Sequence, residues 1–547
     1  MKRSHTTLLL LAFSALLACT GLAVTHRTAE SSSAYTPEVG SYMLEQTDLL
    51  GRTVTVPVEF DGERYILADY TRNIFVYNAA LIASQREMTR DKTYMNSYRI
   101  TSKDGVFTDA KAISLYYNVV TAYDFYSKEN IGVDYKGLNG KNDDIAGNWK
   151  ENGEIPLYLF PHFNAGDYRY NAAFFEENGE GYIFSGDGDP NNTLYNIYNQ
   201  TASLDIIAHE YQHGITHFMD KDLEYISETG ALDEAIADIF GMIIENKDPN
   251  TDDFWNVGED CTVTDRVNRS IKYPSKIHPN YRTSFKNKWA CPLNHYSNHD
   301  VNCDFGGVHY NSTIISHLQY TAWEVSPQIF TREVIGKLWF DALVNMPRRA
   351  SFSQFVETLR RSAKNNFDEH TFNALEYSLS LNGYTNDVYH KVTVTDEDGA
   401  FLLSLAVPDG ATPNVPTPVK QSTAQFDYVF TGFTQTIGEI TEDCEFTASF
   451  SAKIREYSIV YITDGKERRV SAEYGSAFEQ VPEGFDGWYL DETYTLPLEE
   501  TAVTGDITLY ARSVSSPIPW LWIGLGAGVV LIGALTAILI LKKKSSK

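Results

Sequence analysis

The chain has 547 residues, too many for one hydrophobic core, so two to four domains are expected. Its 72 Asp and Glu outnumber its 45 Lys and Arg, and the formal net charge of -27 argues against nucleic acid as a partner, because phosphate binding needs the opposite sign. Acidity of this degree is common in secreted and surface proteins and by itself indicates only solubility.

The N-terminus has the pattern of a secretory signal peptide. Two basic residues precede an apolar run over 8–18, which is too short to span a bilayer. We therefore expect a signal peptide at 1–23, followed by a leader with Ser, Thr and Pro at 24–44. The residues before Cys19 also resemble a bacterial lipoprotein box, which leaves lipidation of Cys19 as an alternative.

The region that follows changes from strand-like to helical patterns. Apolar residues alternate over 50–80, for instance at Val54 and Val56, which predicts antiparallel strands. A helix and two further strands are predicted at 110–127, 155–160 and 181–184. The pattern indicates a β-rich lobe at 45–200 and a helical lobe at 201–386.

A pair of histidines lies near the start of the helical lobe, in His-Glu-Tyr-Gln-His. His209 and His213 are four residues apart, so on an α-helix they share a face and can bind one metal ion. Glu234 follows in an apolar helical run that would be buried, and a buried carboxylate needs a partner such as a cation. Two histidines and a glutamate form the ligand set of catalytic zinc, which leaves a fourth position for water.

Glu210, between the two histidines, is the predicted general base, which would take a proton from that water and pass it to the leaving amine. The alternative is a closed structural zinc site, which needs a fourth protein ligand. Nothing between 209 and 238 obviously supplies one, so we favour one catalytic zinc ion.

Residues beyond about 386 are rich in Val, Thr and Tyr, with glycine turns. A repeat with a period near 60 predicts two small β-modules, at 390–454 and 455–514. The second resembles the Listeria–Bacteroides type repeats of bacterial surface proteins. The modules could act as a spacer or bind a cell-surface ligand, and both readings stay open.

The C-terminus carries an apolar stretch over 520–541, which is 22 residues, or about 33 Å as a helix, and predicts one transmembrane helix. Three lysines begin the tail at 542–547 and mark the cytoplasmic side. We expect a single-pass protein of the cell membrane with its bulk outside. The tail resembles the sorting tails of Gram-positive surface proteins, although no LPxTG precedes it, so membrane anchoring is favoured.

Such a compartment permits disulfides. Of the four cysteines after Cys19, Cys291 and Cys303 flank one polar loop and are the favoured pair, although connectivity does not follow from sequence.

Three motifs together resemble the thermolysin family of secreted zinc endopeptidases, in the same order and at similar spacing: HEYQH at 209–213, GALDEAIAD at 230–238 and DFGGVHYNS at 304–312. The resemblance covers roughly 45–385. It implies an α+β, two-lobed peptidase with the first motif on a helix between the lobes, acting on protein or peptide substrates.

The resemblance also implies roles around the metal. Asp238 would accept the second imidazole N–H of His209, as outer carboxylates do. His309 would donate to the oxyanion, with Asp304 orienting its ring and Tyr225 donating beside it. The alternatives are an ordinary helix aspartate and surface loop residues.

For substrate binding, the resemblance implies that Arg269 binds a main-chain carbonyl. Asn171 and Ala172 would lie on an edge strand to which the peptide adds. The pocket after the cleaved bond would be lined by Ile206, Val257, Cys261 and Asn268, with Phe174 nearby. This implies cleavage before a hydrophobic residue, although Asn268 replaces an apolar side chain, and a Cys261 in this pocket would be free.

Four acidic residues fall where the family clusters carboxylates around paired calcium ions: Asp205, Glu245, Asp253 and Glu259. Closely packed like charges need hard cations with oxygen ligands. One or two structural calcium ions are expected. The segment before the tryptophan is longer than in the family, so Asp252 could replace Asp253.

The competing interpretation is a surface adhesin or binding protein whose peptidase domain is degenerate. A degenerate site should lack a ligand or Glu210, and all of them are present.

Overall fold

The computed structural model describes residues 38–514 apart from 83, 90–94, 141–154, 190, 192–198, 222, 262–266 and 292–302. The predicted signal peptide and the predicted membrane segment at 520–541 with its tail lie outside these residues. Among the described residues, no helix combines the length and the apolar character that crossing a bilayer requires.

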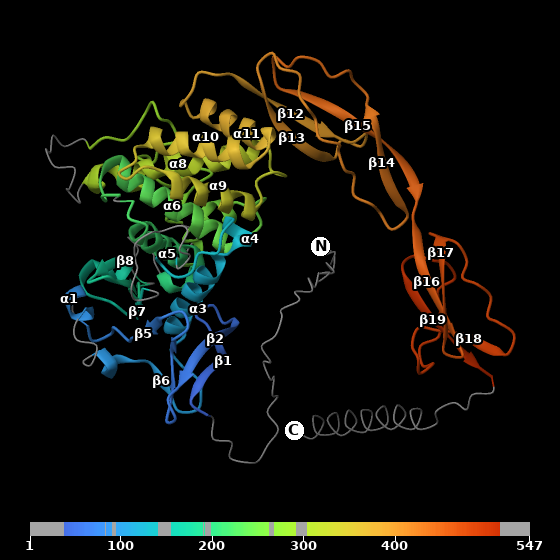
Figure 1. Ribbon diagram of the computed structural model, residues 1–547, viewed down its shortest axis with the longest axis horizontal. Helices are drawn as coiled ribbons and strands as arrows, with labels where there is room; N and C mark the ends of the chain where they lie inside the picture. Colours follow the sequence, from blue (N-terminus) through green and yellow to red (C-terminus); the bar gives the residue numbers. More distant parts are fainter. Residues whose placement is uncertain are drawn as a thin grey trace, which may run out of the picture.

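Two β-sheets form the lobe at the bottom of Figure 1. The first is antiparallel in the order β1-β2-β3-β6, with strands at Gly40–Thr47, Thr53–Phe60, Tyr65–Ile66 and Thr101–Ser102. The second has the order β4-β5-β7-β9-β8, with strands at Ala68–Asp69, Ile74–Val76, Leu157–Pro161, Glu180–Ser185 and Ala172–Glu177. The alternation predicted over 50–80 is confirmed in β2, where Val54, Val56 and Val58 are buried.

The second sheet ends in an edge strand. β5, β7 and β9 run parallel, and β7 is buried along its whole length, as expected for a strand covered on both faces. Within the described residues, β8 pairs only with β9, in antiparallel register. Its outer side therefore presents backbone N–H and C=O groups that can pair with another chain.

The helices lie mostly in the second lobe. The longer ones are α3 (Ala110–Phe125), α5 (Leu204–Phe218), α6 (Ser227–Glu245), α8 (Asp304–Val325), α9 (Arg332–Asn345), α10 (Phe352–Asn366) and α11 (Glu369–Leu381). Short elements are α1 (Gln85–Met88), α4 (Lys128–Ile131), α7 (Pro274–Ile277) and the strand pair β10 (Asn256–Val257) and β11 (Arg269–Ser270). The helix predicted over 110–127 is confirmed by α3, which Asp109 caps by accepting from the N–H of Ala112.

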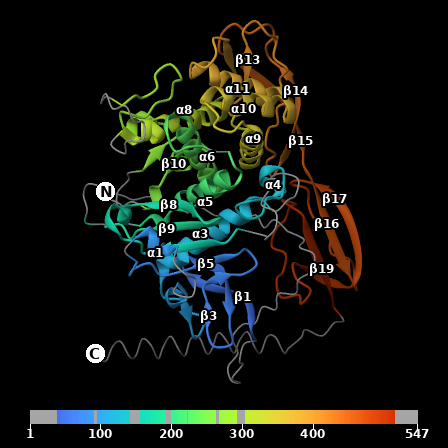
Figure 2. The same cartoon turned by 60° about the vertical axis from the view of Figure 1, so that its left-hand side comes forward.

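α5 runs between the two lobes, as predicted for the helix of the first motif (Figures 1 and 2). It packs on α3 and β8 on one side and on α6 on the other. Its buried Ile207, Tyr211 and Ile215 belong to a hydrophobic core that is continuous through both lobes. Because such interiors are close-packed, α5 holds its polar side chains in fixed positions.

Two further four-stranded sheets follow the helical lobe. The first has the order β13-β12-β15-β14, with strands at Phe401–Pro408, Tyr389–Thr395, Cys444–Ile454 and Phe426–Phe433. The second has the order β17-β16-β19-β18, with strands at Lys466–Glu473, Glu456–Thr463, Ile507–Ser513 and Phe485–Tyr489. Both pair their first and last strands in parallel at the centre, so the sheets share one topology.

Each of these sheets has its own small core, and the first one docks on the helical lobe. Ser404 Oγ donates to the carbonyl of Val325 at 2.7 Å, and Gln328 Nε2 donates to that of Ser404 at 2.6 Å. In Figure 1 the second sheet follows beyond the first, away from the helices.

His162 joins the end of β7 to the start of α3. Its Nδ1 lies 2.8 Å from Asp187 and its Nε2 lies 2.9 Å from Asp109. Burial opposes a charge on the ring, but the two carboxylates raise the pKa of His162 to about 9. The charged His162 ring thereby links the segment between β7 and β8 to the N-terminus of α3.

We expect the stability that His162 contributes to depend on pH. Because its folded pKa lies above the unfolded value of about 6.5, the contribution is complete below about pH 6.5 and is lost as the pH rises through 9. His162→Gln should therefore destabilise the two lobes by about 1–2 kcal/mol more at pH 6 than at pH 10, after allowance for solvent screening. Urea unfolding of both proteins at the two pH values measures this difference, and a gap that does not change with pH would contradict it.

Candidate metal centre

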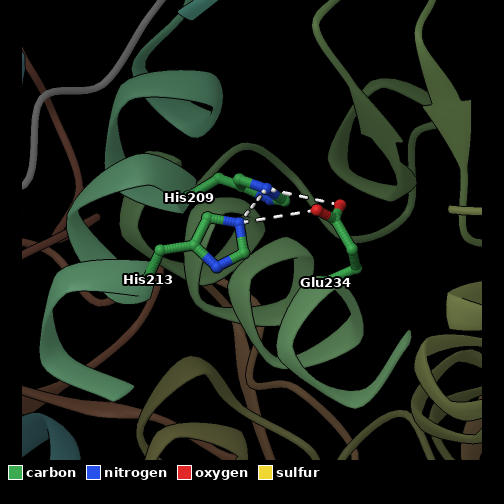
Figure 3. A group of neighbouring side chains, drawn as sticks. All are labelled: His209, His213 and Glu234. Carbon is green, nitrogen blue, oxygen red and sulfur yellow. Dashed lines mark hydrogen bonds and ion pairs between the residues drawn. The ribbon is translucent and has the colours of Figure 1, made fainter. Parts of the chain in front are cut away.

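Three side chains from two helices meet at one point (Figure 3). His209 and His213 come from α5, and their Nε2 atoms lie 3.0 Å apart. Glu234 comes from α6, and its carboxylate oxygens lie 3.6 Å from each Nε2 atom. Since α5 and α6 pack closely side by side, spacing along each helix and packing between them jointly create the group.

The chemistry of these donors fits zinc. Nδ1 of His213 is hydrogen-bonded to Asp233 at 2.9 Å, and Nδ1 of His209 lies 2.9 Å from Asp238 Oδ1 without hydrogen-bond geometry. Ring protons on the two Nδ1 atoms would leave lone pairs on the two facing Nε2 atoms. Glu234 is buried, and its Oε2 accepts no hydrogen bond among the described residues. Burial favours its neutral form, but the surrounding imidazoles and Arg269 hold the pKa of Glu234 well below its usual range. Facing lone pairs and a buried anion are what a cation with nitrogen and oxygen ligands would satisfy.

Each histidine has its own carboxylate partner. The carboxylate nearest to His209 is that of Asp238, whose Oδ1 lies 2.9 Å from Nδ1, so the hydrogen bond that the family resemblance implied stays a prediction. The partner of His213 is Asp233, which sequence reasoning did not single out. Asp233 directly precedes Glu234 on α6, and a second carboxylate at this position was the one feature of the sequence that could have identified it. Only the packing of α6 against α5 shows that this carboxylate meets the ring of His213.

We expect Asp233→Ala to weaken zinc binding by about 10- to 100-fold, because the outer carboxylate fixes the ring orientation of His213 and its basicity. Asp233→Asn keeps a hydrogen-bond acceptor at the same place and should therefore lose less zinc affinity than Asp233→Ala. Competition with a zinc-selective chelator measures both affinities. Equal affinities for the Ala variant and the wild type would contradict the role of Asp233.

Glu210 points from α5 toward the edge strand. Its Oε2 accepts a hydrogen bond from the backbone N–H of Phe174 in β8 at 2.8 Å. Burial raises the pKa of Glu210 above its usual range, against the lowering effect of the neighbouring histidines. The Glu210 carboxylate therefore lies between the outer side of β8 and the side chains of His209, His213 and Glu234, which together are called the metal-binding group below.

The structure also brings together Tyr225, His309 and Asp304. Tyr225 Oη donates to Glu234 Oε1 at 2.5 Å and lies 3.0 Å from His309 Nε2. On the other side of the ring, Nδ1 of His309 lies 2.5 Å from Asp304 Oδ1. Tyr225 and His309 can therefore each direct a polar hydrogen toward one side of the metal-binding group, beside Glu234.

Arg269, in β11, is buried behind the metal-binding group. Its Nε and Nη2 donate to the two oxygens of Asp238 at 2.8 Å and 2.6 Å, and Nη2 lies 3.6 Å from Glu234 Oε2. A guanidinium held in this bidentate way is rigidly placed. Asn171 and Ala172 lie where β8 begins, directly after the 3-10 helix η2 (Gly166–Tyr170), so both are at the edge strand.

Three of the residues assigned to the specificity pocket lie around Gly258: Val257, Cys261 and Asn268. Ile206, Val257 and Cys261 are buried, and Cys261 is a free thiol whose Sγ donates to the carbonyl of Gly258 at 3.1 Å. Asn268 packs directly against Gly258, where an added Cβ would come within 2.9 Å of Nδ2.

Only part of the predicted calcium set converges. Asp205, Glu245 and Glu259 place carboxylate oxygens within 4.8 Å of one another. Asp253 does not join them, because in the 3-10 helix η4 (Asp253–Trp255) the apolar residues take the buried face and Asp253 is exposed. The alternative, Asp252, is exposed and pairs with Lys272.

A lysine that the sequence did not indicate lies in this acidic cluster. The Lys247 ammonium contacts Glu259, lies 3.2 Å from Glu245 Oε1 and lies 3.3 Å from Asp260 Oδ2. Even so, burial and mutual repulsion raise the pKa of Glu245 and of Glu259. One lysine therefore leaves negative charge in the cluster uncompensated, which fits a single further cation.

Comparison with known proteins gives two matches to models of one family. Residues 44–217 match the thermolysin metallopeptidase catalytic domain, and residues 221–378 match the thermolysin metallopeptidase alpha-helical domain. The two matches together cover more than half of the chain and end before β12.

Curated relatives are similar over the same region. Bacillolysin from Bacillus cereus is 28% identical over 305 residues, which are 54% of this chain and 46% of that protein. The thermostable neutral protease NprT from Geobacillus stearothermophilus is 29% identical over 308 residues, or 53% of this chain and 47% of that protein. The chain thus spans about half the length of these relatives. Among solved structures, a precursor of protealysin from Serratia proteamaculans is 20% identical with a TM-score of 0.42, covering 57% of this chain and 87% of that one.

Proposed function

Because the chain belongs to the thermolysin metallopeptidase family, we propose that it is a zinc endopeptidase that hydrolyses peptide bonds with Glu210 as general base. The observation that carries this proposal is the convergence of His209, His213 and Glu234 beside Glu210. All three predicted ligands and Glu210 are present, and His213 and Glu234 are each hydrogen-bonded to a neighbouring side chain, which argues against a degenerate site.

A zinc ion bound by these three side chains would supply Lewis-acid chemistry at the scissile carbonyl. Glu210 would accept the proton of the attacking water and then pass it to the leaving amine. His309 and Tyr225 would donate hydrogen bonds to the developing oxyanion, and the contacts of His309 with Asp304 and Tyr225 support this role.

The substrate would bind as an added strand along the outer side of β8, starting at Asn171 and Ala172, with Arg269 on a main-chain carbonyl. The buried apolar residues around Val257 support a preference for a hydrophobic residue after the cleaved bond.

A peptide library incubated with the purified protein tests this function. We expect cuts before hydrophobic residues, loss of cleavage with a zinc chelator, and recovery when zinc is restored. Cleavage that continues in the chelator would contradict a zinc mechanism, and the absence of any cleavage by the zinc-loaded protein would contradict the function.

We further propose one calcium ion at Asp205, Glu245 and Glu259, with Lys247 neutralising part of the charge. EGTA should then lower the thermal midpoint by about 5–10 °C, because the cation binds only the folded state. Lys247→Met should enlarge this shift, since it removes the internal cation. A midpoint insensitive to EGTA in both proteins would contradict the site.

Finally, we propose that the segment at 520–541 anchors the protein in the cell membrane, with the peptidase lobes outside and the two β-modules as a Listeria–Bacteroides type spacer. Deletion of 515–547 should release the protein from the membrane fraction. Retention of the truncated chain in that fraction would contradict the anchor.

A further inference from the structure

α8 begins with residues in the left-handed backbone region. Asp304 and Phe305 have φ values of 48° and 47°, and Gly306 and Gly307 have values of 85° and 87°. Glycine accepts this conformation readily, whereas the Cβ atoms of Asp304 and Phe305 disfavour it. Contacts from elsewhere must therefore hold the turn in place.

The turn directs the Asp304 carboxylate at His309. Oδ2 of Asp304 accepts hydrogen bonds from the backbone N–H groups of His309 at 2.9 Å and Tyr310 at 3.3 Å, while Oδ1 lies 2.5 Å from His309 Nδ1. The opposite ring nitrogen then faces Tyr225 Oη at 3.0 Å. The conformation of 304–307 thus decides where His309 presents its Nε2.

One short stretch, 289–291, is attached to the chain on both sides of this turn. Before the turn, Cys303 is bonded to Cys291, with Cα atoms 5.4 Å apart, so the favoured pair is confirmed. After the turn, Asn311 exchanges two hydrogen bonds with the backbone of Trp289, at 2.8 Å and 3.1 Å. The two attachments bracket the residues that carry Asp304 and His309.

Two further contacts of the turn are packing contacts. The Trp289 ring covers Gly307, where an added Cβ would come within 2.7 Å of Cε3, and the Phe305 and Tyr225 rings lie 5.5 Å apart. Such contacts can give way when side chains rotate, whereas the disulfide is covalent. Cys303 is also buried directly before Asp304, so its position is transmitted to the turn without an intervening residue.

We propose that the Cys291–Cys303 disulfide is a positioning element for His309: it holds the left-handed turn that aims the ring at the oxyanion. The inference rests on the proposed peptidase function for its kinetic consequence. Misplacing an oxyanion donor by a fraction of its hydrogen-bond length reduces transition-state stabilisation but leaves substrate binding and the metal ligands intact.

A double-mutant cycle tests this coupling in the full-length protein. Cys291→Ala/Cys303→Ala should lower kcat about 10-fold or more, with KM within about threefold of the wild-type value and unchanged zinc content. In a His309→Ala background the same replacement should have no further effect on kcat. Cys444→Ala, which removes a free cysteine in β15, is the matched control and should leave kcat unchanged.

Two outcomes would overturn the inference: an unchanged kcat in the double variant, or an equal loss in the wild-type and His309→Ala backgrounds, which would indicate general destabilisation. If the double variant does not fold, brief reduction of folded wild-type and His309→Ala proteins with a phosphine makes the same comparison.

The imidazole nitrogen NMR signals of His309 decide the question independently of activity. Removal or reduction of the disulfide should shift them, because the hydrogen bond that His309 Nδ1 donates to Asp304 changes, and unshifted signals would overturn the inference. A wild-type protein that cuts no peptide would contradict the proposed function, while these signals would still report on the positioning.

Discussion

Glu210→Gln is expected to lower kcat/KM for peptide cleavage by about 10³-fold, since general acid–base catalysis by a positioned carboxylate contributes on this scale. The amide is isosteric, so its oxygen can still accept the hydrogen bond from the N–H of Phe174. It cannot take a proton from water. The loss should therefore fall on kcat.

Measuring zinc content alongside kinetics separates this role from damage to the metal-binding group. Zinc should remain stoichiometric in Glu210→Gln, because Glu210 is not among the three converging ligands. Glu324→Gln, at an exposed glutamate near the end of α8, should behave as the wild type. Substantial cleavage by Glu210→Gln would remove the proposed mechanism.

Glu234→Gln should have an effect of at least the same size through a different route, namely loss of the metal ion. An amide is a poor zinc ligand, so with only His209 and His213 left we expect the zinc dissociation constant to rise by about 100-fold or more. The variant should still fold, because Arg269 keeps its bidentate partner Asp238 and Tyr225 can donate to the amide oxygen.

Titration of activity with zinc measures this effect. Glu234→Gln should need far more zinc to recover any cleavage, whereas Glu210→Gln should not recover at any concentration. The two variants thereby distinguish a ligand from a base. A Glu234→Gln protein that binds zinc as tightly as the wild type would contradict the assignment of Glu234.

Much of the site can be predicted from the sequence, because its residues are spaced along the chain with the period of an α-helix. The four-residue step from His209 to His213 places both on one face of α5, whatever packs around it. The apolar run around Glu234 predicts its burial for the same reason. The strands of the C-terminal region were likewise predictable, because alternation and turns recur along the chain.

Other features depend on which distant segments meet. Asp253 lies near acidic residues in the sequence, yet the turn of η4 points it to solvent, while Lys247 enters the carboxylate cluster instead. Likewise, the neighbour of Glu210 is the backbone of Phe174, which lies 36 residues earlier on β8.

The sequence alone determined the types of the proposed ligands, the helices that carry them and the order of the lobes, since periodicity is a local property of the chain. Only the tertiary structure decided which carboxylate faces which ring, and that a disulfide closes beside the left-handed turn before His309. The physical reason is that side-chain partners across α5, α6 and α8 are set by the close packing of elements far apart in sequence, which no local pattern records.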